Sequence, residues 1–317
     1  MFKSDTFVTN DITRANIASL SKKQSRLEEQ RICEISELAD DAARYGASML
    51  ADGYGVYEVL SLLSDSALSA TVTNSAVIKE NEPRLLSYVK MTDARDRVSF
   101  SELFTERLSG LGFKIGESDF LRCEDGDRTF TYVKNPLADE AYDVFSQEFD
   151  NPRVKYSVTL AEAAARVGRG EVEFALLPLE ERGGARLAAV AAILFKEDLK
   201  INSVIPVFGY EGTADVKYAL VSRHFSISPI SPDDDRYLEI RLRADSSVAL
   251  SELFFAADAL GTGVYRLNTI TFDTEDGPIL YYSVVFRDEG RDFTSLLTYL
   301  TLFSGAYTPI GIYKNLE

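Results

Sequence analysis

The sequence has very few of the residues that build metal sites and catalytic triads. His224 is the only histidine, and the two cysteines, Cys33 and Cys123, lie far apart with no metal-ligand spacing. The sequence therefore has almost none of the residues that a zinc site with histidine ligands or a Ser-His-Asp triad requires. We expect no metal and no cofactor, and we interpret both cysteines as free thiols.

Basic residues are also scarce. The 317 residues include 34 Lys and Arg against 50 Asp and Glu, a net charge of −16. This balance disfavours nucleic acid and anionic membrane as partners, because both require a basic surface. No apolar run approaches the roughly 18 residues of a spanning helix, and the first residues do not resemble a signal peptide. We therefore expect a cytoplasmic chain of two or three domains.

Strands and helices alternate in the middle of the chain, which indicates an α/β lobe with a parallel sheet. Asn135-Pro136 is typical of a helix start, and Gly168 and Gly170 end a later helix. The loop that follows the third strand, from Pro178 to Gly184, is of a kind that presents backbone N–H groups to an anion. The expected strands are 128–133, 154–158 and 174–177, and the expected helices are 136–145, 160–167 and 187–195.

The last part of the chain predicts a βαββαβ order, that of the ferredoxin-like split unit. Alternating residues predict strands, and apolar residues at helical spacing predict the two helices between them. The expected strands are 236–243, 264–272, 279–286 and 307–313, and the expected helices are 248–260 and 292–303.

The middle segment resembles prephenate dehydratase, whose catalytic domain is of the periplasmic-binding-protein type. Pro178-Leu179-Glu180 matches the start of the family's Pro-Ile-Glu-Asn-Ser loop, and 200–207 and 216–221 resemble the strands that leave and re-enter the first lobe. The family builds a second lobe between these strands, and here only 208–215 intervene. The resemblance implies a truncated, single α/β lobe with an open cleft.

The resemblance also places the family's catalytic residues. The threonine of its Thr-Arg-Phe motif, which assists departure of the hydroxyl, corresponds to Val216, and the arginine corresponds to Lys217. Valine has no proton to transfer, and lysine lacks the bidentate fork of arginine. Glu180 matches, whereas Glu181 and Arg182 replace the amide and hydroxyl. Glu180, Glu181 and Lys217 are thus candidates for a vestigial site.

The C-terminal segments 281–290 and 309–313 look like the ACT regulatory domain that follows the catalytic domain in prephenate dehydratases. The family binds phenylalanine through two segments, which correspond here to Val248, Ala249 and Leu250 and to Thr271, Phe272 and Asp273. Valine replaces the glycine that allows close approach of a ligand. Two interpretations stay open: a ligand sensor of altered specificity, or a dimerisation module that binds nothing.

Residues 1–90 occupy the position of a chorismate-mutase-like domain and are helix-rich, with a break at Gly53-Tyr54-Gly55. The basic residues of the first helix alternate with polar ones as on a solvated face, so a mutase motif is not supported. After them we expect a short helix capped by Ser99 and a strand over 113–117. The predicted domains are 1–90, 91–230 and 231–317.

Two functions follow from the sequence. The favoured one is a non-catalytic relative of prephenate dehydratase, linked to phenylalanine metabolism, that binds a small amino acid or aromatic acid as a homodimer through its ACT-like domain. The alternative is an active dehydratase, converting prephenate to phenylpyruvate, whose cleft is completed by other residues or by a second subunit.

Overall fold

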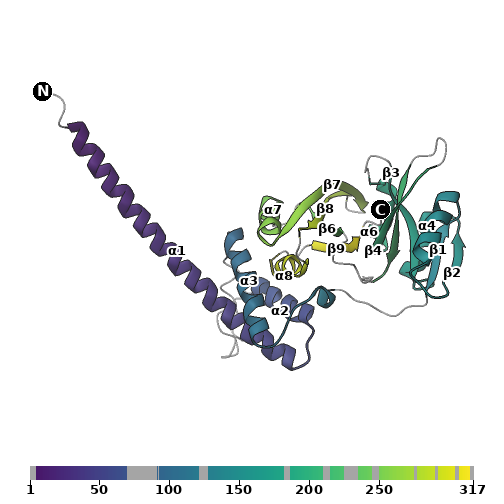
Figure 1. Cartoon of the computed structure of the whole chain (residues 1–317), viewed down its shortest axis with the longest axis horizontal. Coiled ribbons are helices and arrows are strands. Elements are labelled where there is room, and N and C mark those ends of the chain that lie inside the picture. The colour runs from purple at the N-terminus through teal and green to yellow at the C-terminus, as the bar shows by residue number, and fades with distance from the viewer. Residues whose placement is uncertain are drawn as a thin grey trace. The chain divides into compact units, whose positions relative to one another are not determined.

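The computed structural model divides the chain into two compact units, 1–114 and 115–317 (Figure 1). The residues that it describes are 5–69, 91, 93–120, 128–181, 186–209, 215–224, 235–244, 250–274, 277–289, 292–303 and 307–314. No helix among them is long and apolar enough to cross a membrane.

The first unit consists of three described helices, α1 (Asp5–Ala51), α2 (Val56–Ser69) and α3 (Ala94–Gly110). The expected helix break is confirmed: Gly53 has a φ of 94°, a backbone conformation that favours glycine. Figure 1 shows α2 and α3 beside the C-terminal end of α1. The buried hydrophobic side chains of these three helices include Ile35, Ala39, Ala42, Ala43, Val59, Leu60, Leu63, Ala94, Val98, Phe100, Phe104 and Leu108.

Two expectations for the following segment are wrong. α3 begins at Ala94 rather than near Ser99, because the Asp93 carboxylate accepts a hydrogen bond from Arg95 N at 3.0 Å and caps the helix there. The predicted strand over 113–117 is absent, and a short 3₁₀ helix, η2 (Glu117–Phe120), closes this stretch. α3 packs against α1 and is tied to it by Arg107 Nε, 2.8 Å from Asp40 Oδ1.

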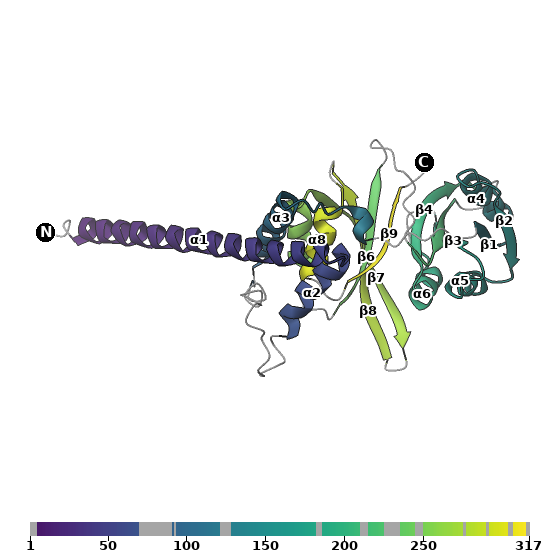
Figure 2. The ribbon, with the colours of Figure 1, turned by 90° about the horizontal axis from the view of Figure 1, so that it is seen from below.

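The second unit begins with an α/β lobe, and the predicted alternation of strands and helices is confirmed. β1 pairs in parallel with β2 and β3, while β5 lies antiparallel between β3 and β4. Figure 2 shows α4, α5 and α6 alongside these strands. The elements are β1 (Thr129–Val133), α4 (Pro136–Ser146), β2 (Arg153–Ser157), α5 (Leu160–Gly168), β3 (Phe174–Glu181), α6 (Ala188–Lys196), β4 (Lys200–Val207) and β5 (Val216–Ser222).

Helix α4 starts where the sequence predicts. The Asn135 side chain accepts a hydrogen bond from Ala138 N at 3.0 Å, and Pro136 occupies the first turn, where no N–H is needed. Ala138, Ala141 and Phe145 are buried against the sheet side of the lobe.

The rest of the second unit is a βαββαβ module, as predicted. Its strands lie in the order β9-β6-β8-β7, and every neighbouring pair is antiparallel. The elements are β6 (Arg236–Arg243), α7 (Leu250–Ala259), β7 (Thr262–Thr274), β8 (Gly277–Asp288), α8 (Thr294–Phe303) and β9 (Tyr307–Lys314).

The lobe and the module share one nine-stranded sheet, in which β4 is the neighbour of β9. The two strands meet in parallel at a single pair, Ile201 and Gly311. A Cβ atom on Gly311 would lie 2.3 Å from the carbonyl oxygen of Ile201, so only glycine permits this approach. The domain boundaries near residues 90 and 230 that the sequence suggests stay a prediction.

Candidate functional site

A bulge in the lobe sheet brings Glu180 and Lys217 side by side. The β3–β5 register shifts between Pro178 and Glu180, which places Glu180 opposite Lys217. A bulge re-aims side chains and tolerates proline, which has no N–H for the ladder. Leu179 and Glu180 are both buried, as are Phe174 to Leu177 before the bulge, because both faces of β3 are covered.

The Glu180 carboxylate is engaged by an arginine of the C-terminal module. Arg266 Nη1, on β7, donates a hydrogen bond of 2.6 Å to Glu180 Oε1. Arg186 lies on the other side, with its Nε 3.8 Å from the same oxygen, which is too far for a hydrogen bond. The side chains of Glu180 and Arg186 are each 6% exposed, so these charges face each other largely away from water.

A second buried carboxylate completes the cluster. Arg186 Nη2 donates to Glu239 Oε2 at 2.5 Å, and Glu239 is only 4% exposed. The same carboxylate accepts the Tyr313 hydroxyl at 3.0 Å and the Ser283 hydroxyl at 2.8 Å. Glu239, Ser283 and Tyr313 come from β6, β8 and β9, so the cluster joins three strands of the module to the lobe.

We call Glu180, Glu239, Arg186 and Arg266 the Glu180–Glu239 cluster. Its two negative carboxylates balance the charge of its two positive guanidinium groups. Burial alone would lower the pKa of Arg186, but the negative charges of Glu239 and Glu180 and the hydrogen bond to Glu239 outweigh it and raise the pKa above the ordinary value. Burial, with the neighbouring Glu239 charge, raises the pKa of Tyr313 well above its ordinary value. The arginines therefore stay charged and the tyrosine neutral at physiological pH.

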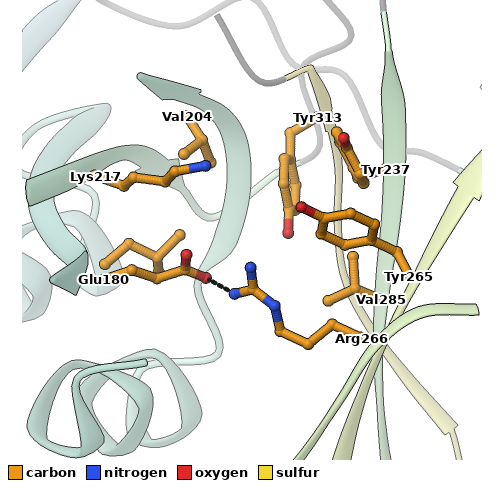
Figure 3. A pocket seen from close by; sticks show the side chains of 9 residues that line it. Glu180, Val204, Lys217, Tyr237, Tyr265, Arg266, Val285 and Tyr313 are labelled. Atoms are coloured by element: carbon orange, nitrogen blue, oxygen red, sulfur yellow. Dashed lines mark hydrogen bonds and ion pairs between the residues drawn. The ribbon is translucent and has the colours of Figure 1, made fainter. Parts of the chain in front are cut away.

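A small cavity adjoins the cluster, and its two walls come from the lobe and from the module. Figure 3 shows Glu180 and Lys217 extending from the lobe toward Arg266, Tyr265 and Tyr313 on the module. The cavity has a volume of about 30 Å³. Because one water needs roughly 10–15 Å³ by this measure, the cavity holds about two water molecules. Its lining is Leu179, Glu180, Val204, Lys217, Tyr237, Tyr265, Arg266, Val285 and Tyr313.

The second wall departs from the open cleft that the sequence implied. The sequence treats the lobe as half of a pocket with nothing opposite it, whereas strands β6 to β9 cover Glu180 and Lys217. Glu181, the third candidate of the predicted vestigial site, and Val216, at the position of the family threonine, differ in their exposure. Glu181 is exposed, and Val216, opposite it on β5, is half-buried.

Of the residues predicted to bind a ligand, those whose side chains the structure describes do not line this cavity. Phe272 is buried and its ring stacks on Phe195 of α6, with ring centroids 4.1 Å apart. Thr271 is exposed, and Leu250 is the first residue of α7. Val248 and Ala249 lie outside the described residues, and Asp273 lies in β7.

A buried arginine accompanies the Phe272–Phe195 stack. The Arg241 guanidinium lies 4.4 Å from the centre of the Phe195 ring and 5.7 Å from that of Tyr281, in cation–π geometry. Burial lowers its pKa. The end of β7 is therefore joined to α6 of the lobe by aromatic and cationic packing.

Sequence reasoning missed Arg186, Glu239 and Arg266. Glu239 and Arg241 alternate with Leu238 and Ile240, a pattern that normally indicates one solvated face. A less direct signal was available. The two helices of a βαββαβ module cover one face of its sheet, and the open side of the lobe needs to be covered by the other face, so charged residues on both faces of β6 are expected to be buried. Among the described residues, no group of three or more His, Cys, Asp or Glu side chains is placed to hold a metal ion.

No protein-family model and no curated protein matches the chain. Solved structures that it is similar to include a prephenate dehydratase from Streptococcus mutans, at 14% identity and a TM-score of 0.48, covering 60% of this chain and 99% of that one. A prephenate dehydratase from Arthrobacter aurescens in complex with L-Phe has 14% identity and a TM-score of 0.43, with 58% and 89% covered. A novel type of quorum-quenching acylase has 17% identity and a TM-score of 0.43, with 60% and 96% covered.

Proposed function

We propose that the chain is a non-catalytic relative of prephenate dehydratase, with a truncated catalytic lobe followed by an ACT-like module that binds a small amino acid or aromatic acid. One observation carries the non-catalytic part. The Glu180 carboxylate, the matching residue of the family motif, is hydrogen-bonded to Arg266 of the chain itself. A group held in this way acts as a structural contact and is not available to a substrate.

The room beside Glu180 supports the same conclusion. Prephenate has ten carbon atoms and two carboxylates, and the cavity holds only about two waters. The negative charge of Glu180 is already balanced by Arg266 and Arg186. A dianion entering this site would have to break these ion pairs and separate the module from the lobe.

The ACT-like module supplies the proposed binding function. Residues 248–250 and the end of β7 correspond to the family's ligand segments, and Phe272 at the end of β7 stacks on Phe195 of the lobe. A ligand that moves this end of β7 would change that stack. We propose that the module binds its ligand there and acts in a homodimer, in the context of aromatic amino acid metabolism.

A turnover assay tests the non-catalytic proposal. Purified chain is incubated with prephenate, and phenylpyruvate is measured beside a protein-free control. We expect the two rates to be equal. Turnover that is lost in Glu180→Gln and kept in Glu181→Gln would overturn the proposal, because Glu181 is the exposed neighbour of the buried Glu180. It would establish the alternative, an active dehydratase.

The alternative has one observation in its favour. Tyr237, Tyr265 and Tyr313 bring three hydroxyl groups to the cavity wall, opposite Lys217. Such groups are able to transfer protons, which a dehydration requires. An active enzyme would need the module to move away from the lobe to admit substrate, and the turnover assay decides between the two functions.

A thermal-shift screen of amino acids and aromatic acids tests the binding proposal. A ligand at a hundred times its dissociation constant stabilises the folded chain by about 2.7 kcal/mol. We expect one member of the screen to raise the melting temperature, and Thr271→Arg to abolish the shift. Thr269→Arg, an exposed change two residues earlier on β7, is the matched control. The absence of any shift would leave only a scaffold role.

A further inference from the structure

Arg241 on β6 is a buried cation with which no described carboxylate forms a salt bridge. The residue is 7% exposed, and its Nε is buried without a hydrogen-bond partner. The two carboxylates whose charges act on it are engaged elsewhere: Glu239 is bound by Arg186, and Asp198 by Lys200. An uncompensated buried charge is costly, so its presence here indicates an anion that the chain itself does not supply.

The pKa values separate Arg241 from the paired arginines of the same interface. Burial lowers the pKa of Arg241. Arg186 and Arg266 are also buried or partly buried, but the carboxylates beside them outweigh the burial and raise the pKa of both. Arg241 is thus the arginine of this interface whose charge is left without compensation by the described residues.

A second donor on the same face of the sheet also has no partner. Arg241 lies opposite Ser283, and Ser283 lies opposite Asn268, so the three residues form one row across β6, β8 and β7. Residues of one row point to the same face, and this face is turned toward the lobe, because the Arg241 guanidinium lies over Phe195 of α6. Asn268 Nδ2 is buried without a hydrogen-bond partner. Two donors of this layer are therefore not satisfied by any described acceptor.

Three aromatic rings surround the Arg241 guanidinium. The centres of the Phe195, Tyr281 and Phe272 rings lie 4.4, 5.7 and 5.9 Å from its Cζ. The rings also contact one another, with centres between 4.1 and 5.4 Å apart. A ring face attracts a cation but accepts no full hydrogen bond, so the N–H groups of Arg241 remain donors for a carboxylate. The surroundings of such a carboxylate are aromatic.

We propose that Arg241 binds the carboxylate of a small aromatic acid, whose ring packs against Phe195, Phe272 and Tyr281. The acid enters where the Phe195–Phe272 stack closes the end of β7. This inference rests on the proposed binding function and narrows its ligand to an acid without an ammonium group. An α-ammonium group would lie beside the Arg241 cation, and the nearby carboxylates that would balance it are already paired with cations.

Calorimetric titration of the full-length protein with three related compounds is the first test. We expect phenylacetate to bind, and phenylacetamide and L-phenylalanine to bind at least about thirtyfold more weakly, because the first lacks the charge and the second adds an opposing one. Phenylacetamide or L-phenylalanine binding as tightly as phenylacetate would overturn the inference and leave the binding function standing. If none of the three binds, the inference fails. The binding function fails with it only if the wider screen of amino acids and aromatic acids also gives no ligand.

Arg241→Met, with Arg243→Met as its matched control, tests the residue. In Arg241→Met we expect phenylacetate to bind at least about thirtyfold more weakly. The melting temperature of the ligand-free variant is expected to stay equal or to rise, since an apolar side chain relieves the desolvation of an unpaired charge. Arg243→Met removes an exposed arginine two residues further along β6 and is expected to keep the affinity. Undiminished binding in Arg241→Met, with a lower melting temperature, would show that the guanidinium serves packing alone and would refute the inference.

Discussion

Glu180 on β3 and Arg266 on β7 are joined by a hydrogen bond of 2.6 Å, although they are 86 positions apart in the sequence. The bond connects the α/β lobe to the βαββαβ module at the point where the family resemblance places a catalytic residue. Glu180 is the only member of the predicted vestigial site that is fully buried. Its environment is that of a structural ion pair.

Glu180→Gln is expected to lower the free energy of unfolding by about 2–4 kcal/mol. Removing one carboxylate leaves the buried Arg186 and the partly exposed Arg266 incompletely balanced, and uncompensated buried charge is costly. Glu181→Gln, next in the chain and exposed, is expected to change it by less than about 0.5 kcal/mol. Urea unfolding at neutral pH measures both, and equal effects would refute the structural role.

Gly311→Ala is expected to weaken the connection between β4 and β9. The new Cβ would meet the backbone oxygen of Ile201, which has no freedom to move aside, and overpacking of this kind costs about 1–3 kcal/mol. Gly263→Ala is the matched control, because its Cβ would meet the end of the flexible Glu289 side chain at the same nominal distance of 2.3 Å. Similar losses of stability in the two variants would contradict the close approach at Gly311.

The loss of stability caused by Tyr313→Phe is expected to become smaller as the pH rises above about 10. The folded-state pKa of Tyr313 is raised, so the stability that its neutral form contributes is complete below the unfolded pKa of about 10 and is lost as the pH rises above it. At pH 7 the variant is expected to be about 1–3 kcal/mol less stable, through loss of the hydrogen bond to Glu239. Above pH 10 this gap is expected to narrow by about 1.4 kcal/mol per pH unit. Urea titrations of both proteins measure this difference in unfolding free energy. A difference that stays constant up to about pH 11 would rule out the raised pKa of Tyr313.

Local features of the sequence predicted the fold well. Asn135-Pro136 marks the start of α4, Gly53 marks the end of α1, and the spacing of apolar residues gives the βαββαβ order. These signals are short-range, because a cap or a helix break depends on a few neighbouring residues. One helix start was misplaced: the sequence suggested Ser99 as the capping residue of α3, and Asp93 caps it. Both side chains can cap a helix, and the sequence alone does not rank them.

The candidate site was much less predictable. Glu180 and Lys217 were found because a motif and a strand placed them, and their pairing depends on a bulge at Pro178 and Glu180. Arg266 and Glu239 gave no local sequence signal, since charged residues in alternating strands are usually solvated. Their burial results from the packing of the module against the lobe, which is a long-range property of the fold.

A double-mutant cycle on Glu180 and Arg266 tests most directly whether this ion pair ties the module to the lobe. The free energies of unfolding of Glu180→Gln, Arg266→Gln and the double variant are compared with that of the unsubstituted chain. The structure predicts a coupling energy of about 1–3 kcal/mol, with the double variant more stable than the sum of the single losses implies. Losses that add to within about 0.5 kcal/mol would contradict the structural role of Glu180 and make it available for other chemistry.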